Sequence, residues 1–538
     1  MSSESELTPI GRSEPPLLVA SNRLPILLLR DEGRRWYAEP SSGGLVTALE
    51  PVLRQRGGTW VGWPGILEGE VEELEAVLER EAGAAPYRLE PVELTREERS
   101  DFYEGFSNEL LWPLFHGFIG PCRFDPRFWD AYRVVNRKFA RAILSVCQSR
   151  QLVWVHDYHL MAVGQELRRA GCENRVGFFL HIPFPSAELF ERLPWAHELL
   201  DALLAYDLVG FQTRRDLRNF LDVVRHLRPF ECRVHGELLL SRDRSERPTR
   251  VGVHPISIDN QLFREHARSE EVSCRARELR ASAGARRILL GVDRLDYTKG
   301  IPEKLMAFER LLEAHPELVG EVTLVQLVIP SRDPIPTYVR TRERIEELVA
   351  RIEERWARDS WTPVHYQYGS WARDELLAWY RAADVGLVTS LKDGMNLVSK
   401  EFVAASVEGG ALVLSEFAGS ADELREGALL VNPHDVDALS RSIHRALTME
   451  PAERLERLEL MQATILDHDL HHWVRGFLAH AAQEVEVEQE ERIAAAWLAS
   501  SASAPAPRAT SLLPRRPSTR PRRTAPGAHP VEPAAPAS

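Results

Sequence analysis

The chain has 538 residues, of which 44% are hydrophobic and 27% charged, values that are ordinary for a soluble globular protein of two or more domains. Its five cysteines are scattered and show no C-x-x-C spacing, which argues against a disulfide framework and against a zinc ribbon. The formal net charge of −13 disfavours a polyanionic partner, and no apolar run approaches the roughly 20 residues that cross a bilayer.

The two ends of the sequence differ in composition from the rest. Residues 1–16 have neither the basic nor the apolar segment of a secretory signal, so we expect a cytoplasmic protein with a disordered N-terminus. Residues 501–538 contain nine Pro and carry a net charge of +5, which leaves −18 on residues 1–500. We expect 499–538 to be a disordered, solubilising tail, and the alternative use of its Arg pairs is contact with an acidic surface or nucleic acid.

Short apolar runs alternate with longer amphipathic segments, which predicts βαβ units, parallel strands and an α/β fold. In chain order the runs are PLLVASNR, TWVGW, LVWVHDYH, RVGFFLHIPF, DLVGFQT, RVGVHPISI, RILLGVDRL, VTLVQLVIP, DVGLVTS, ALVLSEF and ALLVNP. Eleven strands are too many for one ordinary doubly wound sheet, and they divide near His254-Pro255-Ile256. We therefore predict two Rossmann-like domains, 17–253 and 254–450, facing each other across a cleft, and a helical segment at 451–498.

Polar side chains stand at the ends of six predicted strands, where ligands bind in open α/β sheets. One such residue is more often a solvated loop residue or part of a local ion pair, but six of them on two sheets indicate a shared cleft. These positions are Asn22-Arg23, 156–159, His181, 294–299, Ser331-Arg332 and 392–394.

The cations among these side chains predict a phosphate site, because converging cations beside backbone amides bind phosphate groups. They are Arg23, Arg294, Lys299 and Arg332. The segment 393–401 reads as a loop entering a helix, whose first N–H groups favour a diphosphate. One turn inside that helix, Glu401 either accepts both hydroxyls of a ribose or complements the helix dipole.

Motifs of several other classes are absent. No G-x-G-x-x-G follows a strand and no G-x-x-x-x-G-K-[ST] occurs, which disfavours a nicotinamide dehydrogenase and a P-loop kinase. His156-x-x-His159 has no third ligand at a typical spacing, and Asp467-His468-Asp469 is expected on the surface of a long C-terminal helix. We therefore expect neither a metal ion nor another cofactor.

Eight blocks of the sequence resemble, in order and spacing, the trehalose-6-phosphate synthase family. They are SNRLP, SSGGL, FYEGFSNELLWPLFH, WVHDYHL, FFLHIPFP, VDRLDYTKGIPEK, SLKDGMNLVSKEFVAA and LVLSEFAG, within residues 17–477. The resemblance implies a GT-B fold and transfer of glucose from UDP-glucose to glucose 6-phosphate with retention, which gives α,α-trehalose 6-phosphate and UDP.

The resemblance assigns residues to the donor. Arg294 and Lys299 match the pair that binds the diphosphate, and Asp393 matches a partner of the glucose hydroxyls. Gly43-Gly44 matches the loop that closes over the transferred sugar, although a glycine pair alone is commonly only a turn. The helix start that holds diphosphate and ribose matches Leu397, Val398, Ser399, Lys400 and Glu401, and Trp371 falls near a contact with the base.

The resemblance also assigns an acceptor site, in which Asp157 orients the sugar. The 6-phosphate is held by Arg23, Tyr103 and Arg332, and the positions that bear on anomer choice are Trp112 and His181. The donor cations neutralise the charge of the departing UDP, so no carboxylate nucleophile is required. The resemblance to retaining GT-B enzymes further implies that a leaving phosphate oxygen takes the proton of the acceptor while Asp157 and His181 position the sugars.

Two other functions stay open at this point. A sister enzyme with another acceptor, such as glycerol 3-phosphate, would share the donor residues, whereas Arg23, the FSN segment and Trp112 favour the trehalose pattern. An inactive regulatory module would be expected to lose some site residues, and the sequence retains all of them. Because no phosphatase-like segment follows, we expect a separate phosphatase to act on the product. We expect no nucleic acid or membrane as partner, and a homo-oligomer remains open.

Overall fold

The structure, a computed structural model, describes residues 16–483 except 31–35, 41–43, 72–73, 83–85, 230–231, 236–237, 242–246, 285–286, 333–334 and 359–360. The described residues up to Ala482 belong to one compact unit. The predicted disordered ends lie outside the described residues, apart from residue 16. Among the residues described, no helix is both long and apolar enough to cross a membrane.

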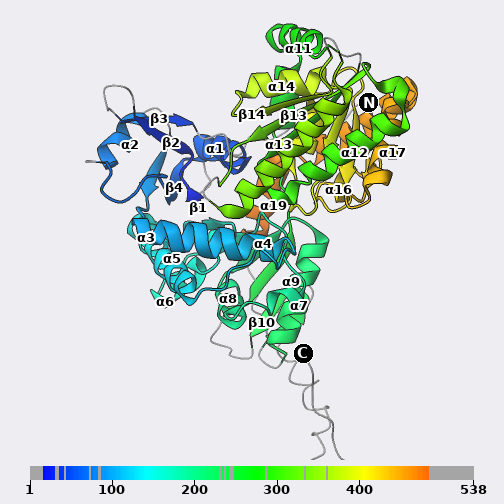
Figure 1. Cartoon of the computed structure of the whole chain (residues 1–538). Helices are drawn as coiled ribbons and strands as arrows, with labels where there is room; N and C mark the ends of the chain where they lie inside the picture. Colours follow the sequence, from blue (N-terminus) through cyan, green and yellow to red (C-terminus); the bar gives the residue numbers. More distant parts are fainter. Residues whose placement is uncertain are drawn as a thin grey trace, which may run out of the picture. The chain divides into compact units, whose positions relative to one another are not determined.

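The N-terminal half of the chain builds a nine-stranded sheet in the order β5-β4-β1-β6-β7-β8-β11-β10-β9 (Figure 1). Its first seven strands run parallel, and β10 pairs antiparallel with β11 and β9. The strands are β1 (Leu17–Arg23), β4 (Gly58–Trp63), β5 (Tyr87–Pro91), β6 (Val153–His156), β7 (Val176–Phe179), β8 (Leu208–Phe211), β9 (Cys232–His235), β10 (Leu238–Ser241) and β11 (Thr249–Val253). A separate hairpin joins β2 (Ile26–Arg30) to β3 (Trp36–Pro40).

Helices cover this sheet. They are α1 (Gly44–Arg56), α2 (Leu74–Ala82), α3 (Arg96–Glu98), α4 (Trp112–Phe115), α5 (Pro126–Val146), α6 (Val163–Arg169), α7 (Ala187–Phe190), α8 (Ala196–Leu203), α9 (Arg214–Leu227), the π-helical η1 (Arg99–Leu111) and the short η2 (Tyr158–Leu160). The π-helix is uncommon at this length, and nothing in the residue spacing had indicated it.

The C-terminal half builds a six-stranded parallel sheet in the order β14-β13-β12-β15-β16-β17. This is the doubly wound order 3-2-1-4-5-6, whose switch point lies between β12 and β15. The strands are β12 (Arg287–Arg294), β13 (Val322–Ile329), β14 (Val364–Tyr368), β15 (Val385–Val388), β16 (Ala411–Ser415) and β17 (Leu429–Val431).

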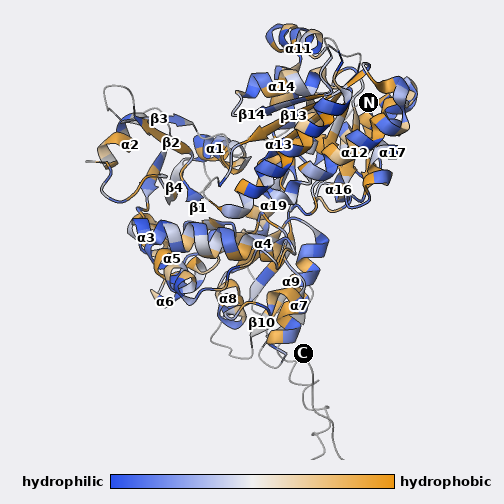
Figure 2. Ribbon diagram, viewed as in Figure 1, coloured by the Kyte–Doolittle hydropathy of each residue, from blue (hydrophilic) through white to orange (hydrophobic). Residues whose placement is uncertain are grey.

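Alternate side chains of β12 enter two separate cores, because neighbouring residues of a strand point to opposite faces. Leu290 joins the core on one face of the sheet and Leu289 the core on the other. Figure 2 shows β13 mainly hydrophobic and α11 largely hydrophilic. The helices here are α10 (Asn260–Ala267), α11 (Glu270–Ser282), α12 (Ile301–Ala314), α13 (Pro336–Trp356), α14 (Arg373–Ala382), α15 (Leu397–Ala405), α16 (Ala421–Leu424), α17 (Val436–Leu447) and the short η3 (Tyr297–Lys299) and η4 (Pro316–Leu318).

All eleven predicted strands are present, and the prediction of two doubly wound sheets is confirmed. The strands that were not predicted form a hairpin or lie at or beside sheet edges: β2, β3, β5, β9, β10 and β14. The domain boundaries at 253/254 and 450/451 stay predictions.

The prediction of one long C-terminal helix through Asp467-His468-Asp469 is wrong. The chain forms α18 (Pro451–Asp467) and α19 (Leu470–Ala482), and the carboxylate of Asp469 accepts the backbone N–H of His472 at 2.7 Å. A carboxylate that accepts this N–H starts a new helix, which is why the pattern is interrupted here. The second helix then packs on the N-terminal sheet, where the Phe477 ring stacks on Trp154 with centroids 4.4 Å apart.

Candidate active site

Lys299 and Asp393 form an ion pair at the switch point of the second sheet, between β12 and β15. Lys299, which follows β12, lies with its Nζ 2.6 Å from Oδ2 of Asp393, in the loop after β15. Burial opposes ionisation of Asp393, but the neighbouring ammonium of Lys299 outweighs it and holds the pKa of this carboxyl below its usual value. Both predicted donor residues are therefore charged and within reach of one ligand.

The loop after β15 is shaped by Asn396, which starts α15. Its φ of +77° is left-handed, and its side-chain oxygen accepts the backbone N–H of Ser399 at 3.1 Å. Its amide nitrogen donates to Asp393 at 3.1 Å, and Ser390 donates to the same carboxylate oxygen at 3.1 Å. These bonds fix the start of α15, where the predicted donor residues Leu397 and Val398 are half-buried.

Two predicted donor residues of α15 point in different directions. Glu401 is held by Tyr380, whose hydroxyl donates to its Oε2 at 2.7 Å, and burial raises the pKa of Glu401. The ammonium of Lys400 instead turns into the protein, 2.7 Å from Glu423, and donates to the carbonyl of Ile256 at 3.0 Å. The Lys400 side chain is thus committed to the interior of the protein.

Two close approaches bring residues of the N-terminal half against this loop. A Cβ added to Gly394 would lie 2.1 Å from the backbone oxygen of His181, and one added to Gly44 would lie 2.9 Å from Leu397. Gly43 lies outside the described residues. The loop before α15 therefore lies against the predicted residues His181 and Gly44 of the N-terminal half.

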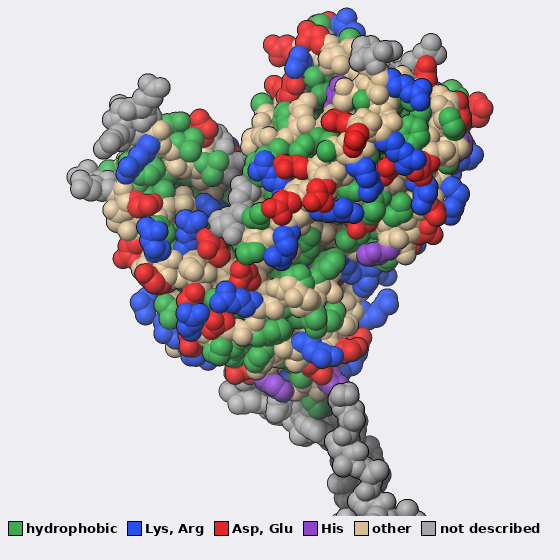
Figure 3. Space-filling view, viewed as in Figure 1, with side chains coloured by type: hydrophobic (Ala, Val, Ile, Leu, Met, Phe, Trp, Pro, Cys, Tyr) green, Lys and Arg blue, Asp and Glu red, His purple; other side chains and the backbone are tan. Residues whose placement is uncertain are grey.

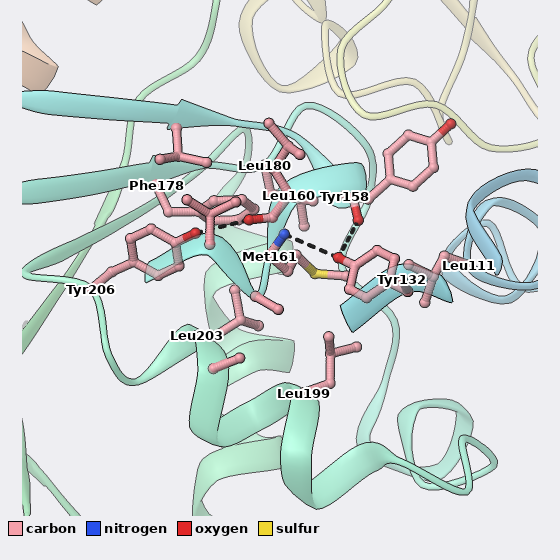
Figure 4. Packing of buried hydrophobic residues seen from close by; sticks show 14 of the residues in the cluster. Leu111, Tyr132, Tyr158, Leu160, Met161, Phe178, Leu180, Leu199, Leu203 and Tyr206 are labelled. Carbon is pink, nitrogen blue, oxygen red and sulfur yellow. Dashed lines mark hydrogen bonds between the residues drawn. The ribbon is translucent and has the colours of Figure 1, made fainter. Parts of the chain in front are cut away.

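Asp157 stands in the turn that follows β6. Its φ of +74° is left-handed, and its Oδ1 accepts the backbone N–H of His181 at 3.2 Å. Burial raises the pKa of Asp157 to about 6. Three hydrogen bonds that involve buried tyrosines hold the turn (Figure 4). The Tyr132 hydroxyl donates to the Tyr158 carbonyl at 2.8 Å and accepts the backbone N–H of Met161 at 3.0 Å, and the Tyr206 hydroxyl donates to the Leu160 carbonyl at 2.9 Å.

His181 is paired with His156, since Nε2 of the first lies 3.1 Å from Nδ1 of the second. Burial lowers the pKa of His181 to about 3 and that of His156 well below its usual value, so both rings are neutral near pH 7. A neutral His181 acts by hydrogen bonding and position. Among the described residues, neither His156 nor His159 belongs to a group of three potential metal ligands.

The guanidinium of Arg332 contacts residues of both halves of the chain. Its Cζ lies 4.0 Å from the centre of the Trp112 ring, which Arg294 also approaches, at 5.6 Å. It donates to the hydroxyls of Tyr338 and Tyr158 at 2.5 and 2.9 Å. Its φ of +54° is left-handed, so this backbone is strained for a non-glycine residue.

The other predicted phosphate ligands lie at the end of β1 and on the π-helix. The Cζ of Arg23 lies 4.1 Å from the centre of the Trp63 ring and 5.8 Å from that of Tyr103. Asn108 donates to the carbonyl of Tyr103 at 2.7 Å and accepts from the hydroxyl of Tyr158 at 2.8 Å. Through Tyr158 the π-helix is connected to Arg332.

His116 was not singled out as a site residue from the sequence. His116 is buried, its Nδ1 lies 2.7 Å from the Trp112 carbonyl, and burial lowers its pKa to about 4. Its charge environment includes Lys299 and Asp393, which places it beside the donor loop. The W-x-x-x-H spacing was the available signal, because residues i and i+4 share a helix face. Trp371, which the resemblance assigns to a position near the base, is half-buried before α14.

Residues 15–483 match the model of glycosyltransferase family 20. The chain is 43% identical over 477 residues to the trehalose-6-phosphate synthase of Mycolicibacterium vanbaalenii, covering 88% of this chain and 96% of the relative. It is similar to the structure of a UDP-forming α,α-trehalose-phosphate synthase from Burkholderia xenovorans in complex with glucose-6-phosphate (TM-score 0.78, 35% identity, 87% of this chain and 100% of that one). It is equally similar to an E. coli structure bound with UDP-2-fluoro glucose (TM-score 0.78, 35% identity, 87% and 99%).

Proposed function

The chain belongs to glycosyltransferase family 20, and on this premise we propose that it transfers glucose from UDP-glucose to glucose 6-phosphate with retention, producing α,α-trehalose 6-phosphate and UDP. The observation that carries the proposal is the close approach of Gly394 to the backbone of His181, which joins the donor loop to the acceptor side. Similar structures that hold glucose-6-phosphate and UDP-2-fluoro glucose support the two substrates.

On the donor side, the reaction needs charge neutralisation for the departing UDP. Arg294, Lys299 and the amides at the start of α15 supply it. When a diphosphate binds, Lys299 exchanges its partner Asp393 for phosphate oxygens, and the carboxylate becomes available to the hydroxyls of the glucose. Glu401, held by Tyr380, accepts the ribose hydroxyls.

On the acceptor side, the 6-phosphate is bound by Arg23, Tyr103 and Arg332. The ionised Asp157 accepts a hydroxyl of the acceptor sugar, and the neutral His181 donates at the junction between the sugars. The acceptor's proton passes to a leaving phosphate oxygen on the same face, so the C1–O bond to UDP breaks as the new glycosidic bond forms. Trp112, packed under Arg332, limits the orientation in which the acceptor can bind.

We propose further that the reaction uses no metal or other cofactor, since the cationic side chains supply the charge. A cytoplasmic location fits the cysteines, because Cys122, Cys147, Cys172 and Cys274 are free.

Figure 3 shows Lys, Arg, Asp and Glu interspersed on the face in view, which fits small-molecule substrates and not nucleic acid. A separate phosphatase would consume the product.

The test is nucleotide release from UDP-, ADP- and GDP-glucose, with and without glucose 6-phosphate, in EDTA. We expect UDP release that depends on glucose 6-phosphate and a non-reducing disaccharide phosphate identified by mass. Release only with another acceptor, such as glycerol 3-phosphate, would assign the sister activity. No release with any acceptor would leave the inactive regulatory module. Loss of activity in EDTA that Mg²⁺ restores would overturn the metal-free reaction.

A further inference from the structure

Two histidines and a glutamate meet at the far end of α12 from the active site. His315 follows α12, Glu317 lies in η4, and His444 lies in the last turn of α17. The rings of His315 and His444 are stacked, with centroids 3.6 Å apart and planes 4° apart. Nδ1 of His315 lies 3.2 Å from Oε1 of Glu317. The first turn of α12 follows Lys299, so its length of about 21 Å separates this cluster from the donor site.

The three side chains are close enough to share one ion. One candidate ligand atom from each lies within 4.8 Å of the other two, and within the described part of the chain no other group of His, Cys, Asp and Glu meets this condition. The surface cluster of His468, Glu423 and His472 does not meet it, although His468 contacts Glu423 at 3.2 Å.

The three side chains are also of the right chemical kind. A neutral imidazole nitrogen and an ionised carboxylate oxygen are the forms of His and Glu that bind a metal ion, because ligands must be deprotonated.

We infer that His315, Glu317 and His444 form a binding site for a divalent transition-metal ion, with zinc the best fit. Two imidazole nitrogens and one carboxylate oxygen, completed by water, match tetrahedral zinc, whose ligand distances are about 2.0–2.2 Å. In the structure the rings of His315 and His444 are stacked, so their lone pairs run parallel. To bind one ion, both rings must turn about χ2 so that their nitrogens converge on it. The ion takes the place of the direct contact between Nδ1 of His315 and Oε1 of Glu317. Mg²⁺ and Ca²⁺ prefer oxygen ligands and do not compete.

A bound ion links the C-terminal end of α12 to the last turn of α17. Because it binds the folded chain and not the unfolded one, it raises the melting temperature. It does not change turnover, since none of the three residues belongs to the proposed active site. The site is therefore a structural one.

The test uses the full-length chain, freed of metal with EDTA and dialysed, then titrated with ZnCl₂ by calorimetry and with CoCl₂ by visible absorption. The variants are His444→Asn and Glu317→Gln, and the matched control is the double variant His468→Asn/His472→Asn. Thermal unfolding is measured with Zn²⁺ and with Mg²⁺, and UDP release is measured on each protein.

We expect wild type and control to bind one Zn²⁺ with the same affinity, tetrahedral Co²⁺ absorption, and a melting temperature raised by Zn²⁺ but not by Mg²⁺. Each ligand variant should lose roughly tenfold or more in affinity and lose the Co²⁺ spectrum, with UDP release unchanged. Equal Zn²⁺ affinity in wild type and both ligand variants, or no binding below about 1 mM, would overturn the site. If one variant fails to fold, the other decides.

Discussion

Asp157 makes the free enzyme sensitive to pH, because burial raises the pKa of its carboxyl to about 6. If the ionised form orients the acceptor, kcat/KM for glucose 6-phosphate falls as the pH is lowered through about 6. The substrate phosphate titrates near the same pH. The variant Asp157→Asn distinguishes the ionisation of Asp157 from that of the phosphate. It should lower kcat/KM about 10- to 100-fold, and the remaining pH dependence of kcat/KM should be that of the phosphate alone. Identical profiles in both enzymes would refute the role.

The same carboxyl has an opposite effect on stability. Its pKa is higher in the folded chain than the ordinary value of 3.8, so folding favours the protonated form and stability is lost as the pH rises from about 4 to about 6. Two pKa units correspond to at most about 3 kcal/mol at pH 7. We expect Asp157→Asn to melt at a higher temperature than wild type at pH 7, and the difference to shrink below about pH 5. A lower melting temperature at pH 7 would contradict this.

Tyr380 positions Glu401 by a hydrogen bond of 2.7 Å. Tyr380→Phe should raise KM for UDP-glucose about 2- to 10-fold, the worth of one hydrogen bond, with kcat nearly unchanged. With a 2′-deoxyribose donor the variant should lose less, because the ribose contact is already missing. The control is Tyr87→Phe, which removes a hydroxyl that contacts Glu50 at 3.4 Å outside the site. If the variant raises KM equally for both donors, Tyr380 does not act through the ribose, and the prediction is wrong.

At the scale of elements, the loop before α15 must touch the turn after β7. Gly394→Ala would place Cβ 2.1 Å from the backbone oxygen of His181, which cannot move aside as a flexible side chain would. We expect at least about 100-fold lower kcat/KM with the fold retained, because a displacement of about 1 Å can cost that much. The control is Gly120→Ala, where a Cβ meets nothing within 4 Å. Activity near wild type in Gly394→Ala would show that the contact is not needed.

Element prediction succeeded where a strand is buried on both faces and failed at the margins. β13 is buried almost throughout, and its mainly apolar sequence VTLVQLVI was visible as a strand. The edge strand β14, VHYQY, has one buried, three partly buried and one exposed residue, and offers no such run. The π-helix η1 was not predicted because its hydrogen bonds join residues five apart and not four apart, so its side chains do not follow the period of an α-helix.

At the scale of the whole molecule, α19 fastens the end of the described chain to the first sheet. The Phe477 ring lies where Gly177 and Gly210 leave room, since a Cβ on either would lie 2.9 or 2.8 Å from it. Phe477→Ala should lower the free energy of unfolding by about 3–5 kcal/mol, measured by denaturant unfolding. Leu466→Ala, at a side chain 53% exposed, should change it by less than about 0.5 kcal/mol. Equal effects would mean that α19 is not part of the folded core.

The sequence by itself determined the class of fold, the eleven predicted strands, the family and the segments that carry the candidate site. These follow from local information: buried parallel strands need continuous apolar runs, and ligand-binding groups follow them at the carboxyl edge. The charged residues at the end of β12 could thus be located. The sequence does not show which of Asp293, Arg294 and Lys299 faces the core and which faces the candidate site.

Only the tertiary structure decided which charge faces which partner. Asp293 lies in the core, 2.6 Å from Lys304, whereas Lys299 pairs with Asp393 in the site. Lys400 turns to Glu423 while its neighbour Glu401 turns to Tyr380. A buried charge must find its counter-charge in space, and these partners lie 11 to 94 residues apart. The physical reason is that hydrophobic periodicity is local, whereas the pairing of buried charges is set by packing between distant segments.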